Sequence, residues 1–187
     1  MLIPKSMTIT DVFRVHYVRT TMKRDALFVD VDMGGKTIRL CTTHLESLTA
    51  IPPKRPQQLA KAAEYLHKAH AGILGGDLNA IQDFDRDLAS RNDLKDAYLE
   101  MGHVEGALVG MTWGQMAATF SRKRHGLTRM DKMLFCGAVE VEDLQTFGMD
   151  VQVEDESDRQ KLIRQEGLEK GWVTDHLGIK AIFRLVS

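Results

Sequence analysis

The chain has 187 residues and a mass of 21.1 kDa, and its 25 lysines and arginines nearly balance its 26 aspartates and glutamates. This balance excludes a uniformly basic nucleic-acid binder, and a hydrophobic content of 43% excludes a disordered chain. No run of about 18 apolar residues is present, so we expect no membrane partner. Because no secretory signal is visible either, we expect the nucleus or the cytoplasm. Cys41 and Cys136 lie in apolar runs without CxxC spacing, which favours buried free thiols over a disulfide.

Strand-like segments dominate the start of the chain. Residues 1–24 are basic enough to suggest a mitochondrial presequence, but their β-branched and aromatic residues favour a strand or a connection. Residues 26–33 and 36–44 flank the pair Gly34–Gly35, a pattern typical of a β-hairpin with a two-residue loop.

Two helices are predicted in the middle of the chain. The first follows a loop rich in proline, and its apolar face consists of Leu59, Ala62, Ala63 and Leu66. The second is expected near residues 93–101, capped by Asn92 or Asp93 and ended by Gly102.

The last third of the chain returns to strands. Residues 129–137, 138–148 and 178–186 are predicted strands, whereas the acidic stretch 150–170 is predicted to be a solvated, partly helical insertion. In the final strand one face is expected to carry Ile179, Ala181, Phe183 and Leu185. Because strands alternate with helices, the expected fold class is α/β or α+β with layered sheets.

Four segments place a polar or ionisable group at the end of a strand-like run. They are residues 41–47 with His44, residues 74–81 with Asp77 and Asn79, residues 129–135 with Asp131, and residues 173–179 with Asp175 and His176. Strand ends are where a sheet presents reactive groups from a rigid scaffold, so we expect the four segments to converge.

Asp77 and Asn79 follow two glycines that allow a sharp turn of the backbone. Strand alternation would send both side chains to the same side, one as a base or metal ligand and the other as a neutral hydrogen-bond donor. A calcium-binding EF-hand loop starting at Asp77 is excluded, because Gln82 and Leu88 stand where glycine and glutamate are required.

Asp131 lies in an otherwise apolar strand and therefore needs a partner. Two alternatives have equal weight. Asp131 could form an ion pair with Arg129 or Lys132, or it could orient the imidazole of His176 as in other histidine dyads.

Five motifs in order resemble the endonuclease/exonuclease/phosphatase superfamily, which has the fold of DNase I. They are THLES (43–47), GGDLNAI (75–81), TWG (112–114), RMDKMLF (129–135) and TDHLGI (174–179). The combination looks most like the tyrosyl-DNA phosphodiesterase 2 branch, although Ala80–Ile81–Gln82 lacks the arginine expected there. The resemblance implies part of a four-layer α/β/β/α sandwich without its N-terminal strands.

The resemblance also implies roles for the catalytic residues. Asp77 would orient and deprotonate the attacking water, and Asn79 would hold that water or a phosphate oxygen. His176 would stabilise the charge that develops on the phosphorus centre, and Asp131 would hold His176 in place.

Substrate and metal contacts are implied in the same way. His44 and Ser47 would contact the phosphate, and Asp175 would help to anchor Mg²⁺, with Mn²⁺ as an alternative. Trp113 would line the substrate groove or belong to the core, with equal weight. The substrate would be a phosphodiester of DNA or of a nucleic-acid adduct. Inositol phosphates and sphingomyelin, which the superfamily also hydrolyses, are alternatives. The basic stretch 122–132 could meet a phosphate backbone, but a solvated loop is favoured.

One part of the superfamily pattern is missing. The superfamily carries an early asparagine and a glutamate that bind the metal, whereas here no asparagine or glutamate precedes His44. We therefore expect residues 1–187 to be the C-terminal portion of one such domain, with little or no turnover in isolation. The alternatives are an Mg²⁺-dependent phosphodiesterase and a silent remnant or binding module. No obligate protein partner can be inferred.

Overall fold

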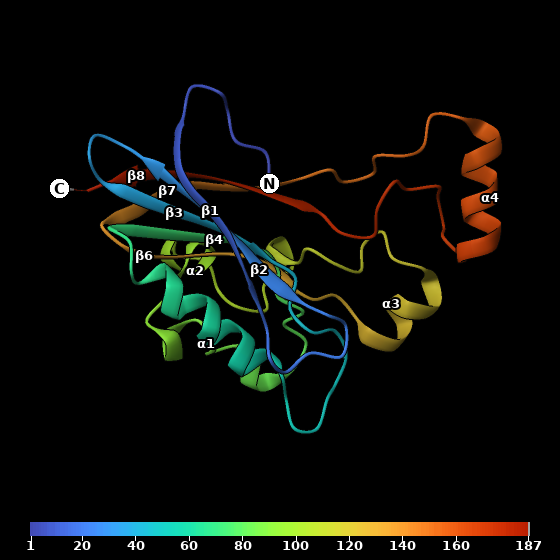
Figure 1. Ribbon diagram of the computed structural model, residues 1–187. Coiled ribbons are helices and arrows are strands. Elements are labelled where there is room, and N and C mark those ends of the chain that lie inside the picture. Colours follow the sequence, from blue (N-terminus) through green and yellow to red (C-terminus); the bar gives the residue numbers. More distant parts are fainter. Residues whose placement is uncertain (187) are drawn as a thin grey trace.

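The computed structural model describes residues 1–186 and is built on a six-stranded sheet with the strand order β1-β2-β3-β4-β6-β5 (Figure 1). The strands are β1 (Thr8–His16), β2 (Asp25–Asp32), β3 (Thr37–Thr43), β4 (Ala71–Asp77), β5 (Lys95–Asp96) and β6 (Asp131–Gly137). Only β3 and β4 run parallel to each other, and every other pair in this sheet is antiparallel.

The predicted hairpin is confirmed as β2 and β3. Gly34 and Gly35 adopt positive φ angles of 68° and 81°, and the amide of Met33 donates to the carbonyl of Lys36 at 3.0 Å, which closes a two-residue loop. The basic N-terminal segment forms β1 and pairs with β2, so the expectation of a strand there is also confirmed.

Helix α1 (Arg55–Leu66) connects the parallel strands β3 and β4 and covers one face of the sheet. Proline in its first turn suits a helix start, and the four predicted apolar residues are all buried. They join one core cluster with Phe28, Leu74 and Leu134 of the sheet. The predicted first helix is confirmed.

The opposite face of the sheet is covered by a second, two-stranded antiparallel sheet of β7 (Val139–Phe147) and β8 (Gly178–Leu185). Phe183 of β8 meets Phe135 of β6 edge to face, with ring centroids 5.5 Å apart. The result is a mixed α/β arrangement of helix, sheet and sheet, which confirms the predicted class.

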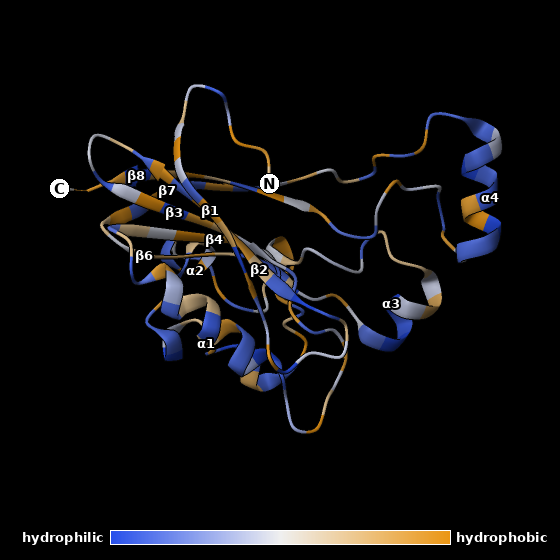
Figure 2. Cartoon of the chain, viewed as in Figure 1, coloured by the Kyte–Doolittle hydropathy of each residue, from blue (hydrophilic) through white to orange (hydrophobic). Residues whose placement is uncertain are grey.

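The connection from β7 to β8 extends away from the sheets and carries α4 (Glu156–Glu166) (Figure 1). The Asp155 carboxylate caps this helix by accepting from the amide of Asp158, and the helix surface is largely hydrophilic (Figure 2). The predicted acidic, partly helical insertion is confirmed. A second short helix, α3 (Thr119–His125), lies in the connection before β6.

The prediction of a second helix over residues 93–101 is wrong for most of that range. Asp93 is left-handed and ends a one-turn 3-10 helix, while β5 pairs with β6, with Asp96 opposite Leu134. Only α2 (Ala97–Glu100) is helical, and its cap is Asp96, whose carboxylate accepts from the amide of Tyr98. Sheet pairing replaces the first turns of the expected helix, because a strand edge satisfies the backbone groups at Lys95–Asp96.

Cys41 and Cys136 are both buried and free, as predicted. Among the helices of residues 1–186, none has the length and apolar character needed to cross a membrane.

Candidate active site

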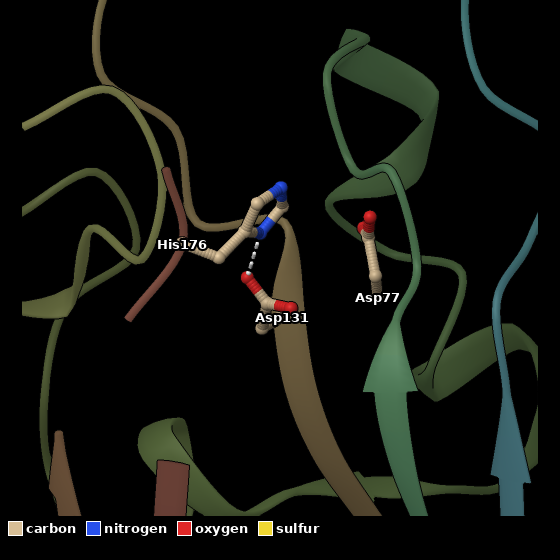
Figure 3. A group of neighbouring side chains, drawn as sticks. All are labelled: Asp77, Asp131 and His176. Carbon is tan, nitrogen blue, oxygen red and sulfur yellow. Dashed lines mark hydrogen bonds and ion pairs between the residues drawn. The ribbon is translucent and has the colours of Figure 1, made fainter. Parts of the chain in front are cut away.

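The sheet register brings three of the four predicted segments together. Asp77 at the end of β4 pairs with Asp131 at the start of β6. The amide of Leu45 donates to the carbonyl of Asp77 at 2.9 Å, which draws the segment after β3 to the same edge. Asp77, Asp131 and His176 therefore lie beside one another (Figure 3), and His44 borders the group. The expected convergence is confirmed.

Asp131 and His176 form a dyad. Nδ1 of His176 lies 2.8 Å from Oδ2 of Asp131 (Figure 3). This hydrogen bond raises the pKa of His176 and outweighs the opposing effect of its burial. The imidazole is thus stabilised in its charged form, with Nε2 left to face a ligand.

The alternative partners of Asp131 are engaged elsewhere. Arg129 and Lys132, both buried, pair with the carboxylates of Asp96 on β5 and of Glu105 on the connection after α2. Of the two interpretations of Asp131, the structure therefore shows the pairing with histidine.

Asp77 faces His44, with Nε2 of the imidazole 3.1 Å from Oδ2 of the carboxylate. Burial raises the pKa of Asp77, and the nearby carboxylate of Asp131 adds to the rise. Burial lowers the pKa of His44, and the positive charge of Arg24 acts in the same direction. A carboxylate with a raised pKa is a better proton acceptor than a solvated one, which suits Asp77 to general-base chemistry.

The side chain of Asn79 does not follow the strand alternation that we expected. The strand ends at Asp77 and Asn79 has a φ of +48°, so the alternation does not continue to it. Its amide N–H donates to Oδ1 of Asp77 at 2.8 Å, and its Nδ2 donates to the carbonyl of Leu45 at 3.1 Å. The prediction that both side chains follow the strand alternation is wrong, and Asn79 instead orients Asp77 and ties it to the His44 loop.

Ser47 lies next to a residue that the sequence did not point to. Nη2 of Arg24 donates to Oγ of Ser47 at 3.1 Å, so a guanidinium borders the site beside His44. The hairpin register places Ala26 opposite Thr43. Extending that register by a few residues was the signal that could have found Arg24.

A buried carboxylate holds the loop that carries Arg24. Glu46 accepts hydrogen bonds from Oγ1 of Thr20 at 2.7 Å, from the amide of Thr21 at 2.8 Å and from Nε2 of Gln58 at 3.3 Å. Glu46 belongs to the THLES motif but faces inward, with 2% of its surface exposed. It supports the site from behind and does not line it.

Trp113 and Asp175 bind each other. Nε1 of Trp113 donates to Oδ2 of Asp175 at 2.9 Å, and the indole is buried with Ala117 and Met130. Trp113 was expected either to line the substrate groove or to belong to the core, and its burial agrees with the core interpretation. Asp175 is exposed, and its carboxylate is engaged by the indole.

The oxygen ligands of Asp77 and Asp131 suit a divalent cation. Ligand atoms of Asp77, Asp131 and His176 all lie within 4.8 Å of one another. Two carboxylates so close together repel each other, and oxygen ligands of this kind are what Mg²⁺ and Mn²⁺ prefer. Within residues 1–186 no glutamate joins this group, and neither does Asp175. Water and substrate would have to complete the coordination shell.

One family model matches most of the chain. The Endonuclease/Exonuclease/phosphatase family matches residues 6–176. No curated protein sequence matches the chain. The fold is similar to that of D. rerio TDP2 complexed with single strand DNA product, with a TM-score of 0.68 and 19% identity over 95% of this chain and 68% of that one.

Two further structures share the fold. Truncated Caenorhabditis elegans TDP2 has a TM-score of 0.68 and 22% identity over 97% of this chain and 68% of that one. A mannosyl-6-phosphatase from Bacteroides thetaiotaomicron has a TM-score of 0.66 and 15% identity over 96% and 67% of the two chains. At these identities the likeness shows the fold alone. The match of the family model to residues 6–176 confirms the predicted resemblance to the endonuclease/exonuclease/phosphatase superfamily.

Proposed function

Since the chain belongs to the endonuclease/exonuclease/phosphatase family, we propose that it hydrolyses a phosphodiester of DNA or of a nucleic-acid adduct with the help of Mg²⁺. The observation that carries this proposal is the arrangement of Asp77 opposite the Asp131–His176 dyad at one edge of the sheet. This arrangement supports a proton acceptor and an imidazolium donor that share one site, since backbone pairing holds both groups.

Each residue has a role that follows from its environment. Asp77, oriented by the amide of Asn79, accepts a proton from the attacking water. As the new P–O bond forms and the bond to the leaving oxygen breaks, Nε2 of His176 donates a hydrogen bond to the negatively charged phosphoryl oxygens. Asp131 keeps the imidazole charged and fixes its orientation.

The cation would be held by the carboxylates of Asp77 and Asp131. When bound, it supplies positive charge that neutralises the phosphoryl oxygens and lowers the pKa of bound water. Mn²⁺ would serve the same purpose, because it accepts the same oxygen ligands.

A nucleic-acid substrate is supported by the charge beside the site. Helix α3 carries four basic residues in its last turn, and the ring of His125 lies 6.3 Å from that of Trp113. Lys123 and Arg124 are exposed, whereas Arg122 pairs with Glu169. A cavity of about 370 Å³ bordered by Ser121, Trp172 and Asp175 adjoins this helix and offers room for part of a substrate.

Two observations favour other candidates. The similarity to a mannosyl-6-phosphatase supports a phosphatase acting on a phosphoester that is not a nucleic acid. The small number of carboxylates in the cluster supports a catalytically silent binding module, since Mg²⁺ prefers about six oxygen ligands.

The test is a hydrolysis assay on bis(p-nitrophenyl) phosphate with Mg²⁺ or Mn²⁺ titrated from zero. Turnover that requires the cation and falls by about 10²–10⁴-fold in Asp77→Ala would support the proposal and would overturn the expectation of little or no turnover in isolation. Asp83→Ala is the matched control, because that side chain is 95% exposed and only pairs with Arg86. A 5′-phosphotyrosyl oligonucleotide and a sugar phosphate, assayed in parallel, distinguish the substrate classes. Equal rates for wild type and Asp77→Ala would contradict the proposal.

A further inference from the structure

Thr112 is not a member of the dyad, but it forms hydrogen bonds to the segment of Asp131 and to the segment of His176. Its side chain is buried, with 1% of the residue exposed, and its Oγ1 accepts from the amide of Asp131 at 3.0 Å. Pairing between β5 and β6 stops at Leu134, so β5 does not reach the start of β6. The Thr112 hydroxyl therefore supplies an acceptor for this partly buried amide, which has no strand partner on that side.

The backbone of the same residue holds the segment of His176. The carbonyl of Thr112 accepts from the amide of Leu177 at 2.7 Å, and Trp113 forms a bridge to His176. The amides of Thr112 and Trp113 both donate to the carbonyl of Thr128 at 3.0 Å. Thr112 is thus anchored independently of the two residues that it connects.

We propose that Thr112 is a positioning residue that sets the distance between Asp131 and His176, an inference that rests on the proposed function. Asp131 belongs to β6 and His176 to the loop before β8, and the two are 45 positions apart. One residue whose hydroxyl binds the first segment and whose carbonyl binds the second fixes their separation. Its carbonyl bond survives any side-chain change, so only the Asp131 side of the connection depends on the hydroxyl.

The experiment compares Thr112→Val with Thr112→Ser in the full chain. Valine has nearly the same shape but places a methyl group against the Asp131 amide, whereas serine keeps the acceptor. In the valine variant we expect faster hydrogen exchange at the Asp131 amide and changed ring-nitrogen shifts of His176 in long-range ¹H–¹⁵N spectra. We also expect a loss of about 10- to 100-fold in kcat on bis(p-nitrophenyl) phosphate with KM unchanged. Thr112→Ser should restore all three.

Each outcome has a defined meaning. If Thr112→Val does not fold, Thr112→Ala replaces it, because alanine removes the same acceptor without the added methyl contact. Wild-type shifts of His176 and wild-type kcat in the valine or alanine variant would overturn the proposal, as would a serine variant that behaves like valine. If the wild type itself shows no turnover, the proposed function fails, but the His176 shifts still decide whether Thr112 positions the dyad.

Discussion

Nδ1 of His176 meets Oδ2 of Asp131 at 2.8 Å, although 45 positions separate the two residues in the chain. The bond raises the pKa of His176 and keeps its ring charged at a higher pH than a solvated imidazole. This charged imidazole beside Asp77 at the edge of the sheet is the feature from which the expected pH dependence follows.

Asp131→Asn should lower the pKa of His176 toward 6.5, because the amide no longer favours the imidazolium. NMR titration of the His176 ring in EDTA measures this directly. The alkaline limb of the rate–pH profile should move to lower pH in parallel. Asp158→Asn, on the exposed helix α4, is the control. An unchanged His176 titration in Asp131→Asn would show that the dyad does not control this pKa.

The same pair contributes to stability with a defined sign. Since the pKa of His176 is raised on folding, its contribution is fully present below the unfolded value of about 6.5. The contribution is lost as the pH rises through the folded pKa. In wild type this pair makes the unfolding free energy larger at pH 6 than at pH 9. The difference between the two pH values should therefore be smaller in Asp131→Asn than in wild type, as measured by urea unfolding at both pH values.

Lys123→Ala/Arg124→Ala should weaken binding to single-stranded DNA, because both cations are exposed on α3 beside the site. Each lost phosphate contact should reduce the slope of log affinity against log salt by about 0.7. Fluorescence anisotropy at several salt concentrations measures both quantities. Lys161→Ala on α4 removes an exposed cation that pairs with Asp158 and should leave the slope unchanged. The same slope in all three proteins would rule out α3 as a contact for DNA.

Glu46→Gln should destabilise the protein at neutral pH by about 1–3 kcal/mol, since a buried charged acceptor is lost. Burial alone would raise the pKa of Glu46, but hydrogen bonds from Thr21, Thr20 and Gln58 lower it to about 2. Its stabilising contribution is therefore present above the unfolded pKa of about 4.3 and is lost as the pH falls toward about 2.

Urea unfolding at pH 7 and at pH 3 measures the Glu46 effect. The difference between wild type and Glu46→Gln should shrink at the lower pH. Glu100→Gln, which breaks an exposed ion pair with Lys95, is the control and should show no such difference. A Glu46→Gln effect that is equal at both pH values would mean that the charge of Glu46 is not the cause.

Arg129→Met should cost about 3–5 kcal/mol in unfolding free energy, because it leaves the buried carboxylate of Asp96 without its main partner. The guanidinium also lies over the ring of Tyr98, at 4.7 Å from its centroid. Arg91→Ala breaks an exposed pair with Asp87 and should change stability by less than about 1 kcal/mol. Similar losses in the two variants would indicate that the buried network contributes little.

The local pattern of residues was sufficient for much of the architecture. Gly34–Gly35 predicted the hairpin because positive φ angles at two successive residues are a local requirement, and helical spacing from Leu59 to Leu66 predicted α1. The same kind of pattern placed Asp77 and Asp131 at strand ends. The assignment of residues 1–187 to the C-terminal portion of a larger domain stays a prediction.

Contacts between distant segments decided the rest. Whether Asp131 pairs with Arg129 or with His176 depends on which segments lie on each side of β6, and no spacing along the chain encodes that. Arg24 reaches Ser47 only because the β2–β3 register brings residues 23 positions apart together. Lys95–Asp96 leaves its predicted helix because a strand edge is available to pair with it. Local geometry thus determines most of the elements, but sheet pairing decides a short segment such as Lys95–Asp96. The partners of a buried charge are set by the long-range packing that removes it from water.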